Sequence, residues 1–141
     1  MSHEVKNGGC LCGAVRYQVS GPVRDIVNCH CEMCVRIHGA AGAHSKARKS
    51  DITITHDKGL AWYETSQIAR RGFCKICGSG LFWEPLAQDG TGILAGTLDD
   101  CDELRTIGHI FVAEKPGFYN ITDDLPQFEG SSEGKLPGDY L

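Results

Sequence analysis

The sequence predicts a mainly β fold that is held together by bound zinc, and two observations carry this prediction. Short segments alternate apolar and polar residues between turn residues, which is the pattern of half-buried strands. Seven of the eight cysteines fall into three short clusters, namely Cys10 and Cys12, then Cys29, Cys31 and Cys34, then Cys74 and Cys77. Bound metal can supplement the modest core of a small domain, so the two observations agree.

The first predicted strand covers residues 14–19, where Val15, Tyr17 and Val19 face one side and Gly21-Pro22 follow as a stop. Further strands are predicted at residues 52–55, 60–63, 80–83, 92–95 and 109–112. The largest aromatic side chains of these segments are expected to dominate the core: Trp62, Trp83 and Phe111.

Helix is predicted at only two places. Residues 32–38 can form about two turns that end at Gly39, and residues 99–104, which begin with acidic residues, can form one more. We expect a single domain over residues 1–129. Residues 130–141 are rich in Gly, Ser, Pro and charged residues, which predicts a mobile C-terminal tail.

Composition excludes several classes of function. The N-terminal residues are polar and no apolar run approaches membrane-spanning length, which predicts a cytoplasmic protein without a membrane partner. Cytosolic thiols stay reduced, so clustered cysteines there favour metal binding over disulfides. The formal net charge of −4 becomes more negative when thiolates bind zinc, so we expect no nucleic-acid partner. The oligomeric state is left open.

Four of the cysteines are predicted to form a closed structural zinc site. Residues two apart in an extended strand point the same way, so Cys10 and Cys12 can bind one ion together. Cys74 and Cys77 form a zinc-knuckle pattern, in which Gly78 tolerates the left-handed backbone that follows. The two pairs are joined here because a four-thiolate site needs two pairs, and only these two lie outside the triple cluster.

The remaining cluster is predicted to form an open, catalytic-type zinc site. Cys29, Cys31 and Cys34 would converge where a strand end runs into a helical turn, and three ligands leave one tetrahedral position for water or substrate. The cysteines thus predict two Zn²⁺ ions per chain. The alternative is that a fourth protein ligand closes this site, and its candidates are His30, His38, His44 and Cys101.

Ligand chemistry narrows the reaction of such an open site. Three thiolates donate so much charge that the zinc is a weak Lewis acid, which makes it poor at ionising water. A fourth sulfur ligand suits it better, and metal coordination lets a thiol exist as thiolate at neutral pH. The sequence therefore favours a small-molecule thiol over hydrolysis.

These motifs resemble the glutathione-dependent formaldehyde-activating enzyme family, which also includes centromere protein V. The resemblance runs through residues 8–17, 29–34, 38–40, 71–78, 81–83, 96–100 and 109–112. It implies a β-tent fold of packed antiparallel sheets. It also implies structural zinc on Cys10, Cys12, Cys74 and Cys77, and catalytic-type zinc on Cys29, Cys31 and Cys34. The implied activity is that of a carbon–sulfur lyase, which adds glutathione to formaldehyde to give S-(hydroxymethyl)glutathione.

Two other functions remain open as alternatives to the lyase. A non-catalytic, zinc-stabilised binding module is the main alternative, and a redox sensor comes third. Arg16, Arg70 and Arg71 could hold substrate carboxylates, but surface charge is the commoner role of arginine. Residues 42–49 are more polar than expected for the family and are interpreted as a solvated loop, while Cys101 is interpreted as a bystander.

Overall fold

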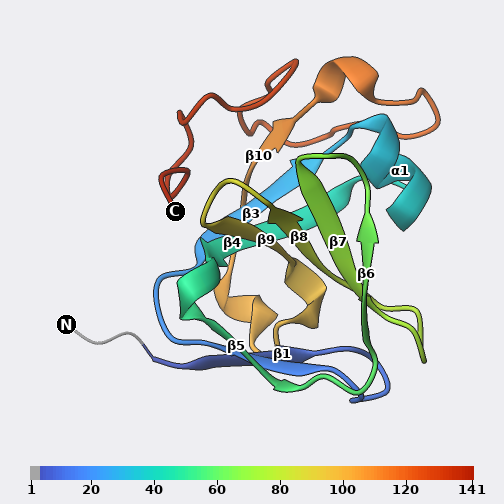
Figure 1. Cartoon of the computed structure of the whole chain (residues 1–141). Coiled ribbons are helices and arrows are strands. Elements are labelled where there is room, and N and C mark those ends of the chain that lie inside the picture. The colour runs from blue at the N-terminus through green and yellow to red at the C-terminus, as the bar shows by residue number, and fades with distance from the viewer. Residues whose placement is uncertain (1–3) are drawn as a thin grey trace.

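The computed structural model describes residues 4–141, which form two sheets and one α-helix (Figure 1). The smaller sheet has three antiparallel strands in the order β1 (Lys6–Gly9), β2 (Arg16–Val19) and β5 (Ile52–His56). It lies below the larger sheet in Figure 1. The prediction of a mainly β fold is confirmed. No helix of residues 4–141 is long and apolar enough to cross a bilayer.

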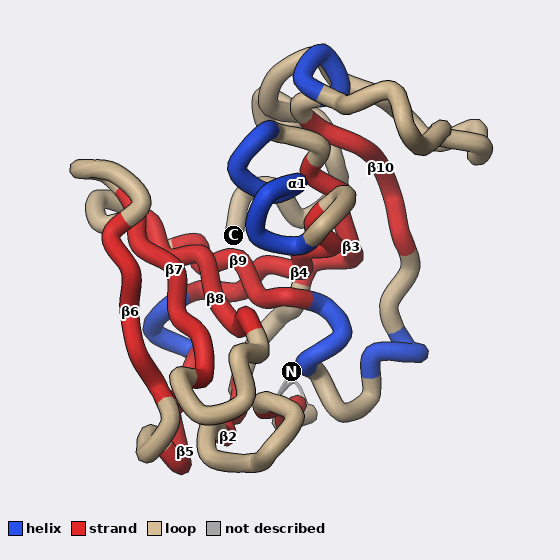
Figure 2. The backbone as a smooth tube through the Cα atoms, turned by 90° about the vertical axis from the view of Figure 1, so that its right-hand side faces the viewer, coloured by secondary structure: helices blue, strands red, loops and turns tan. Residues whose placement is uncertain are grey.

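The larger sheet has seven strands. Their order is β10 (Thr106–Ile110), β3 (Arg24–Cys29), β4 (Gly42–Arg48), β9 (Gly90–Leu94), β8 (Gly80–Pro85), β7 (Ala69–Cys74) and β6 (Leu60–Glu64). Strands β6 and β10 form its two edges (Figure 2). Neighbouring strands pair in antiparallel fashion. The exception is β10, which runs parallel to β3. This pair departs from the purely antiparallel sheets that the family resemblance implied.

The single α-helix, α1 (Glu32–His38), has the predicted bounds. Cys31 caps its N-terminus by accepting a hydrogen bond from the backbone N–H of Cys34, and Gly39 ends it at φ 85°. The second predicted helix is one short 3₁₀ turn, η3 (Cys101–Glu103). The other 3₁₀ turns are η1 (Lys49–Asp51), η2 (Ala95–Thr97) and η4 (Val112–Glu114).

The core lies between the sheets and does not centre on the three predicted aromatics. Tyr17, Leu81 and Ile93 are fully buried, and Phe82 meets the Tyr17 ring edge-on at 5.0 Å between centroids. Trp62, Trp83 and Phe111 are only half-buried. In β8, Leu81 and Phe82 both belong to the core cluster, whereas Trp83 does not.

Residues 42–49 are not a solvated loop, because β4 lies inside the larger sheet between β3 and β9. Ser45 and Ala47 are fully buried. The polar character that suggested a loop is accommodated by specific partners. The Ser45 hydroxyl donates to the Arg24 carbonyl at 3.0 Å, and the Lys46 ammonium donates to the Asp139 carbonyl at 2.8 Å.

The C-terminal residues 130–141 pack against the larger sheet. Leu136 and Leu141 are buried. Asp139 is paired with Arg24 at 3.4 Å, and its carboxylate accepts hydrogen bonds from the Ser132 hydroxyl and the Leu136 N–H. The composition of this segment does not reveal these contacts, because they join it to strands more than ninety residues away. Its mobility in solution stays a prediction.

Candidate metal centres

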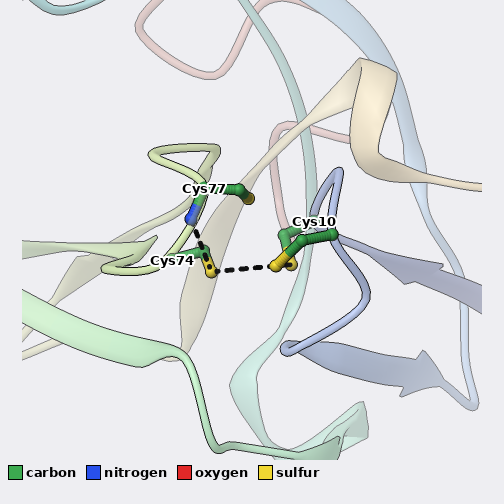
Figure 3. Close-up of side chains that lie close together, drawn as sticks. Cys10, Cys74 and Cys77 are labelled. Atoms are coloured by element: carbon green, nitrogen blue, oxygen red, sulfur yellow. Dashed lines mark hydrogen bonds between the residues drawn. The ribbon is translucent and has the colours of Figure 1, made fainter.

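Two loops bring the first four cysteines together. The sulfurs of Cys10, Cys12, Cys74 and Cys77 all lie within 4.8 Å of one another. Figure 3 shows Cys10 on one loop facing Cys74 and Cys77 on the other. Cys10 Sγ lies 3.7 Å from Cys12 Sγ, which lies 3.8 Å from Cys74 Sγ. Four convergent thiol groups are the donor set that tetrahedral Zn²⁺ prefers, so these residues fit a structural zinc ion.

The two cysteine pairs each end in a turn closed by a glycine. Cys10 and Cys12 lie in a turn after β1 and not in an extended strand as expected, and Gly13 follows them at φ 83°. Gly78 follows the second pair at the same φ. Each glycine N–H donates to the carbonyl of the first cysteine of its pair. A left-handed glycine thus closes each turn and aims both sulfurs of the pair to one side.

Hydrogen bonds hold the sulfurs in place. The backbone N–H of Val15 donates to Cys10 Sγ, and that of Cys77 donates to Cys74 Sγ. The hydroxyl and N–H of Ser79 lower the pKa of Cys77 to about 5. Ser79 Oγ also accepts from the Leu11 N–H at 3.0 Å, which connects the two loops. Partners of this kind orient metal-binding side chains.

The three cysteines of the middle cluster converge where β3 runs into α1. Cys29 ends β3, Cys31 caps α1, and Cys34 lies in the first helical turn. Their sulfurs lie within 4.8 Å of one another. The pKa of Cys31 is lowered because its sulfur accepts hydrogen bonds from the thiols of Cys29 and Cys34, while that of Cys29 is raised because it donates. The donor set fits a zinc ion with an open position.

The candidate fourth ligands have different positions. His30 has no free ring nitrogen, because Nδ1 lies 2.8 Å from the Tyr119 hydroxyl and Nε2 lies 2.9 Å from His109 Nδ1. Cys101 packs beside the core and joins none of the metal-capable groups of residues 4–141. His38 and His44 do not join the three-cysteine group. They form a separate group with Cys34, in which the ligand atoms lie within 4.8 Å of one another.

The three-cysteine group opens into a cavity of about 700 Å³. All three cysteines line it, together with the half-buried Trp83 and Phe111. Ser131, Ser132 and Asp139 of the C-terminal segment line it as well, so residues distant in sequence complete its wall. A cavity of this size accommodates a small molecule.

The three arginines differ in their partners and in their exposure to solvent. Arg16 pairs with Asp99, and Arg70 pairs with Glu84 while its guanidinium lies 3.9 Å from the Trp62 ring centroid. Arg71 lines the cavity and is only 8% exposed, so it is not surface charge. Its guanidinium donates to Cys34 Sγ, His38 Nε2 and Met33 Sδ at 3.4 to 3.5 Å.

Sequence reasoning did not find the chain of side chains behind the middle cluster. His30 connects through His109 to Asp123, whose carboxylate lies 3.0 Å from His109 Nε2. Burial lowers the pKa of His30, and the neighbouring His109 adds to this effect. The parallel pairing of β10 with β3 brings His109 beside His30, and the sequence separation of the two residues gives no sign of it.

Comparison with known proteins decides the family. The model of the glutathione-dependent formaldehyde-activating enzyme family matches residues 5–114. The chain belongs to this family. It is 29% identical over 122 residues to a Schizosaccharomyces pombe protein named as an uncharacterized lyase, with 86% of this chain and 88% of that protein covered.

A solved structure supports the fold. The crystal structure of a Rhodobacter sphaeroides protein superposes with a TM-score of 0.58 at 22% identity, over 86% of this chain and 98% of that one. At this identity the likeness concerns the fold alone. The family assignment that the cysteine motifs suggested is confirmed.

Proposed function

We propose that the protein is a zinc-dependent carbon–sulfur lyase that acts on the adduct of a small thiol and an aldehyde. Glutathione and formaldehyde are the first candidates, with S-(hydroxymethyl)glutathione as the adduct. In the forward direction the sulfur–carbon bond forms and the thiol proton passes to the carbonyl oxygen. The family description and the lyase name of the yeast relative support this class of reaction.

One observation carries the proposal. Cys29, Cys31 and Cys34 line a cavity of about 700 Å³, and no further Cys, His, Asp or Glu of residues 4–141 joins their group. A zinc ion on these three sulfurs would have one coordination position left for a ligand from the cavity. The main alternative, a non-catalytic binding module, was expected to carry a fourth protein ligand, so the three-ligand group favours the lyase.

The residues around the site suit a thiolate. A zinc ion on the three cysteines would supply a coordination position for the substrate sulfur. The guanidinium of Arg71 donates to Cys34 Sγ and offsets part of the negative charge that thiolates bring. Val27, Ile110, Phe111 and Trp83 give the cavity apolar walls, which exclude water from the reacting atoms.

The test is adduct formation with the zinc-loaded protein. Exchange between free formaldehyde and its glutathione adduct is followed by NMR with ¹³C-formaldehyde, and glutathione binding is measured by calorimetry. Cys31→Ala is expected to lose both the acceleration and the binding, while Cys101→Ala keeps both. Exchange at the uncatalysed rate with the wild-type protein, or an unchanged rate with Cys31→Ala, would refute the proposal.

A further inference from the structure

His44 carries an unsatisfied nitrogen in the interior of the protein. Its Nδ1 lies 3.0 Å from the Gly42 carbonyl oxygen, which only accepts, so Nδ1 carries the proton and Nε2 presents a bare lone pair. Among residues 4–141, His44 Nε2 is the only buried side-chain nitrogen or oxygen without a hydrogen-bond partner.

A neutral imidazole in this arrangement is typical of a metal ligand. Histidines that bind metals commonly donate their other ring N–H to a backbone carbonyl, which fixes the tautomer and orients the ring. The Gly42 carbonyl makes that contact here. The structure thus presents a ligand nitrogen whose supporting hydrogen bond is already in place.

Two further ligand groups lie beside His44. Cys34 and His38 are four residues apart on α1, so both project from one face of the helix. The His38 and His44 rings meet at 5.7 Å between centroids. Gly42 keeps this space open, because a Cβ at that position would lie 2.7 Å from the His38 ring and 2.8 Å from the His44 ring.

We propose that Cys34, His38 and His44 bind a further divalent metal ion of the Zn²⁺ type, which shares the Cys34 thiolate with the three-cysteine group. One thiolate and two neutral imidazoles are a donor set that zinc accepts. The three-thiolate group, when it holds zinc, has a net negative charge, so a second cation beside it reduces that charge.

The guanidinium of Arg71 is the competitor for this position. It donates to both Cys34 Sγ and His38 Nε2, which are two of the three ligand groups. No carboxylate of residues 4–141 lies within 4.0 Å of it, so no ion pair opposes its displacement. Binding of the ion therefore requires the guanidinium to release His38 Nε2, while Cys34 Sγ can keep the hydrogen bond from the other guanidinium nitrogen.

The three protein ligands of this ion determine which substrate atom it prefers to bind. An ion held by two imidazoles and one shared thiolate is a stronger Lewis acid than one held by three thiolates, so it prefers oxygen ligands. His44 lines the same cavity as the cysteines. This ion therefore binds the oxygen of the aldehyde. That role rests on the proposed lyase function.

The experiment counts zinc in the full-length, reduced protein at equilibrium with buffered free zinc. We expect three ions per chain for the wild type and two for His38→Gln, His44→Gln and the double variant. His56→Gln, which changes an exposed histidine on β5, serves as the matched control and keeps three. Melting curves verify that the variants fold, and the half-buried His38 gives an informative variant if His44→Gln does not fold.

A second measurement identifies the ligand nitrogen directly. In ¹⁵N-histidine spectra, the third equivalent of zinc should shift His44 Nε2 and leave the His56 signals unchanged. Two ions in the wild type, or three in the double variant, would overturn the proposal. Failure of the lyase hypothesis leaves this count unchanged, because the count is made without thiol or aldehyde.

Discussion

The guanidinium of Arg71 lies 3.5 Å from the sulfur of Cys34, inside the cavity that the three-cysteine group lines. Strand β7 places it there, while the preceding residue Arg70 pairs with Glu84. Two adjacent arginines thus serve different purposes. One balances a carboxylate, and the other faces a cluster of thiols.

Replacement of Arg71 by methionine should weaken thiol binding to the zinc-loaded protein. Hydrogen bonds to charged groups contribute about 1.5–3 kcal/mol, so the dissociation constant should rise about 10- to 100-fold. Calorimetry with glutathione measures this change. Arg71→Lys, which keeps the charge, should recover part of the affinity, and Arg70→Met should keep the wild-type value. Equal losses in the Arg70 and Arg71 variants would contradict a specific role for Arg71.

Gly59 should tolerate no side chain, because a Cβ there would lie 2.6 Å from Cys74 Sγ and 3.0 Å from the Ala14 side chain. Overpacking of this kind costs about 1–3 kcal/mol. We expect Gly59→Ala to lower the free energy of unfolding in urea by that amount and to weaken zinc retention at the four-cysteine group. Gly96→Ala is the control, since nothing lies within 4 Å of its Cβ position. Identical behaviour of the two variants would exclude this crowding.

Loss of one ligand from the four-cysteine group should unfold the domain. A structural zinc site contributes about 10–16 kcal/mol of apparent binding free energy, which is comparable to the whole stability of a domain. Cys74→Ser should therefore lose cooperative thermal unfolding in circular dichroism, whereas Cys101→Ser should melt like the wild type. A Cys74→Ser protein with unchanged melting and full zinc content would show that these four cysteines do not share a structural ion.

Glu84 should make stability depend on pH in the acid range. Burial opposes its ionisation, but Arg70 and Lys49 together lower its pKa below the ordinary value of 4.5. A lowered pKa stabilises the fold above 4.5, and this contribution is lost as the pH falls through the folded pKa. At pH 7, Glu84→Gln should be less stable by about 1.5–3 kcal/mol.

Urea unfolding of wild type and Glu84→Gln at a series of pH values measures this effect. The stability difference should be full at pH 7 and should shrink as the pH falls through the folded pKa, which lies below 4.5. Equal stability of wild type and Glu84→Gln at pH 7 would mean that the ion pairs with Arg70 and Lys49 do not stabilise the fold.

Local patterns predicted some elements well and others poorly. Helix α1 has its predicted bounds because its signals are local, with a capping Cys31 and a left-handed Gly39. All six predicted strands overlap observed ones, but β1, β3, β4 and β7 were not predicted. In β4, Ser45 and Lys46 read as polar surface, yet both have partners that come from distant segments. The alternation of apolar and polar residues cannot reveal a strand whose polar side chains find hydrogen-bond partners inside the fold.

The sequence by itself determined the family, the mainly β class and the grouping of the cysteines into pairs and a triple, because these depend on short spacings. Only the tertiary structure decided which side chains surround the cavity. Arg71 beside Cys34 and the His30–His109 contact both depend on strand order and register. These relationships arise from packing between segments far apart in the chain, and no local pattern of residues encodes them.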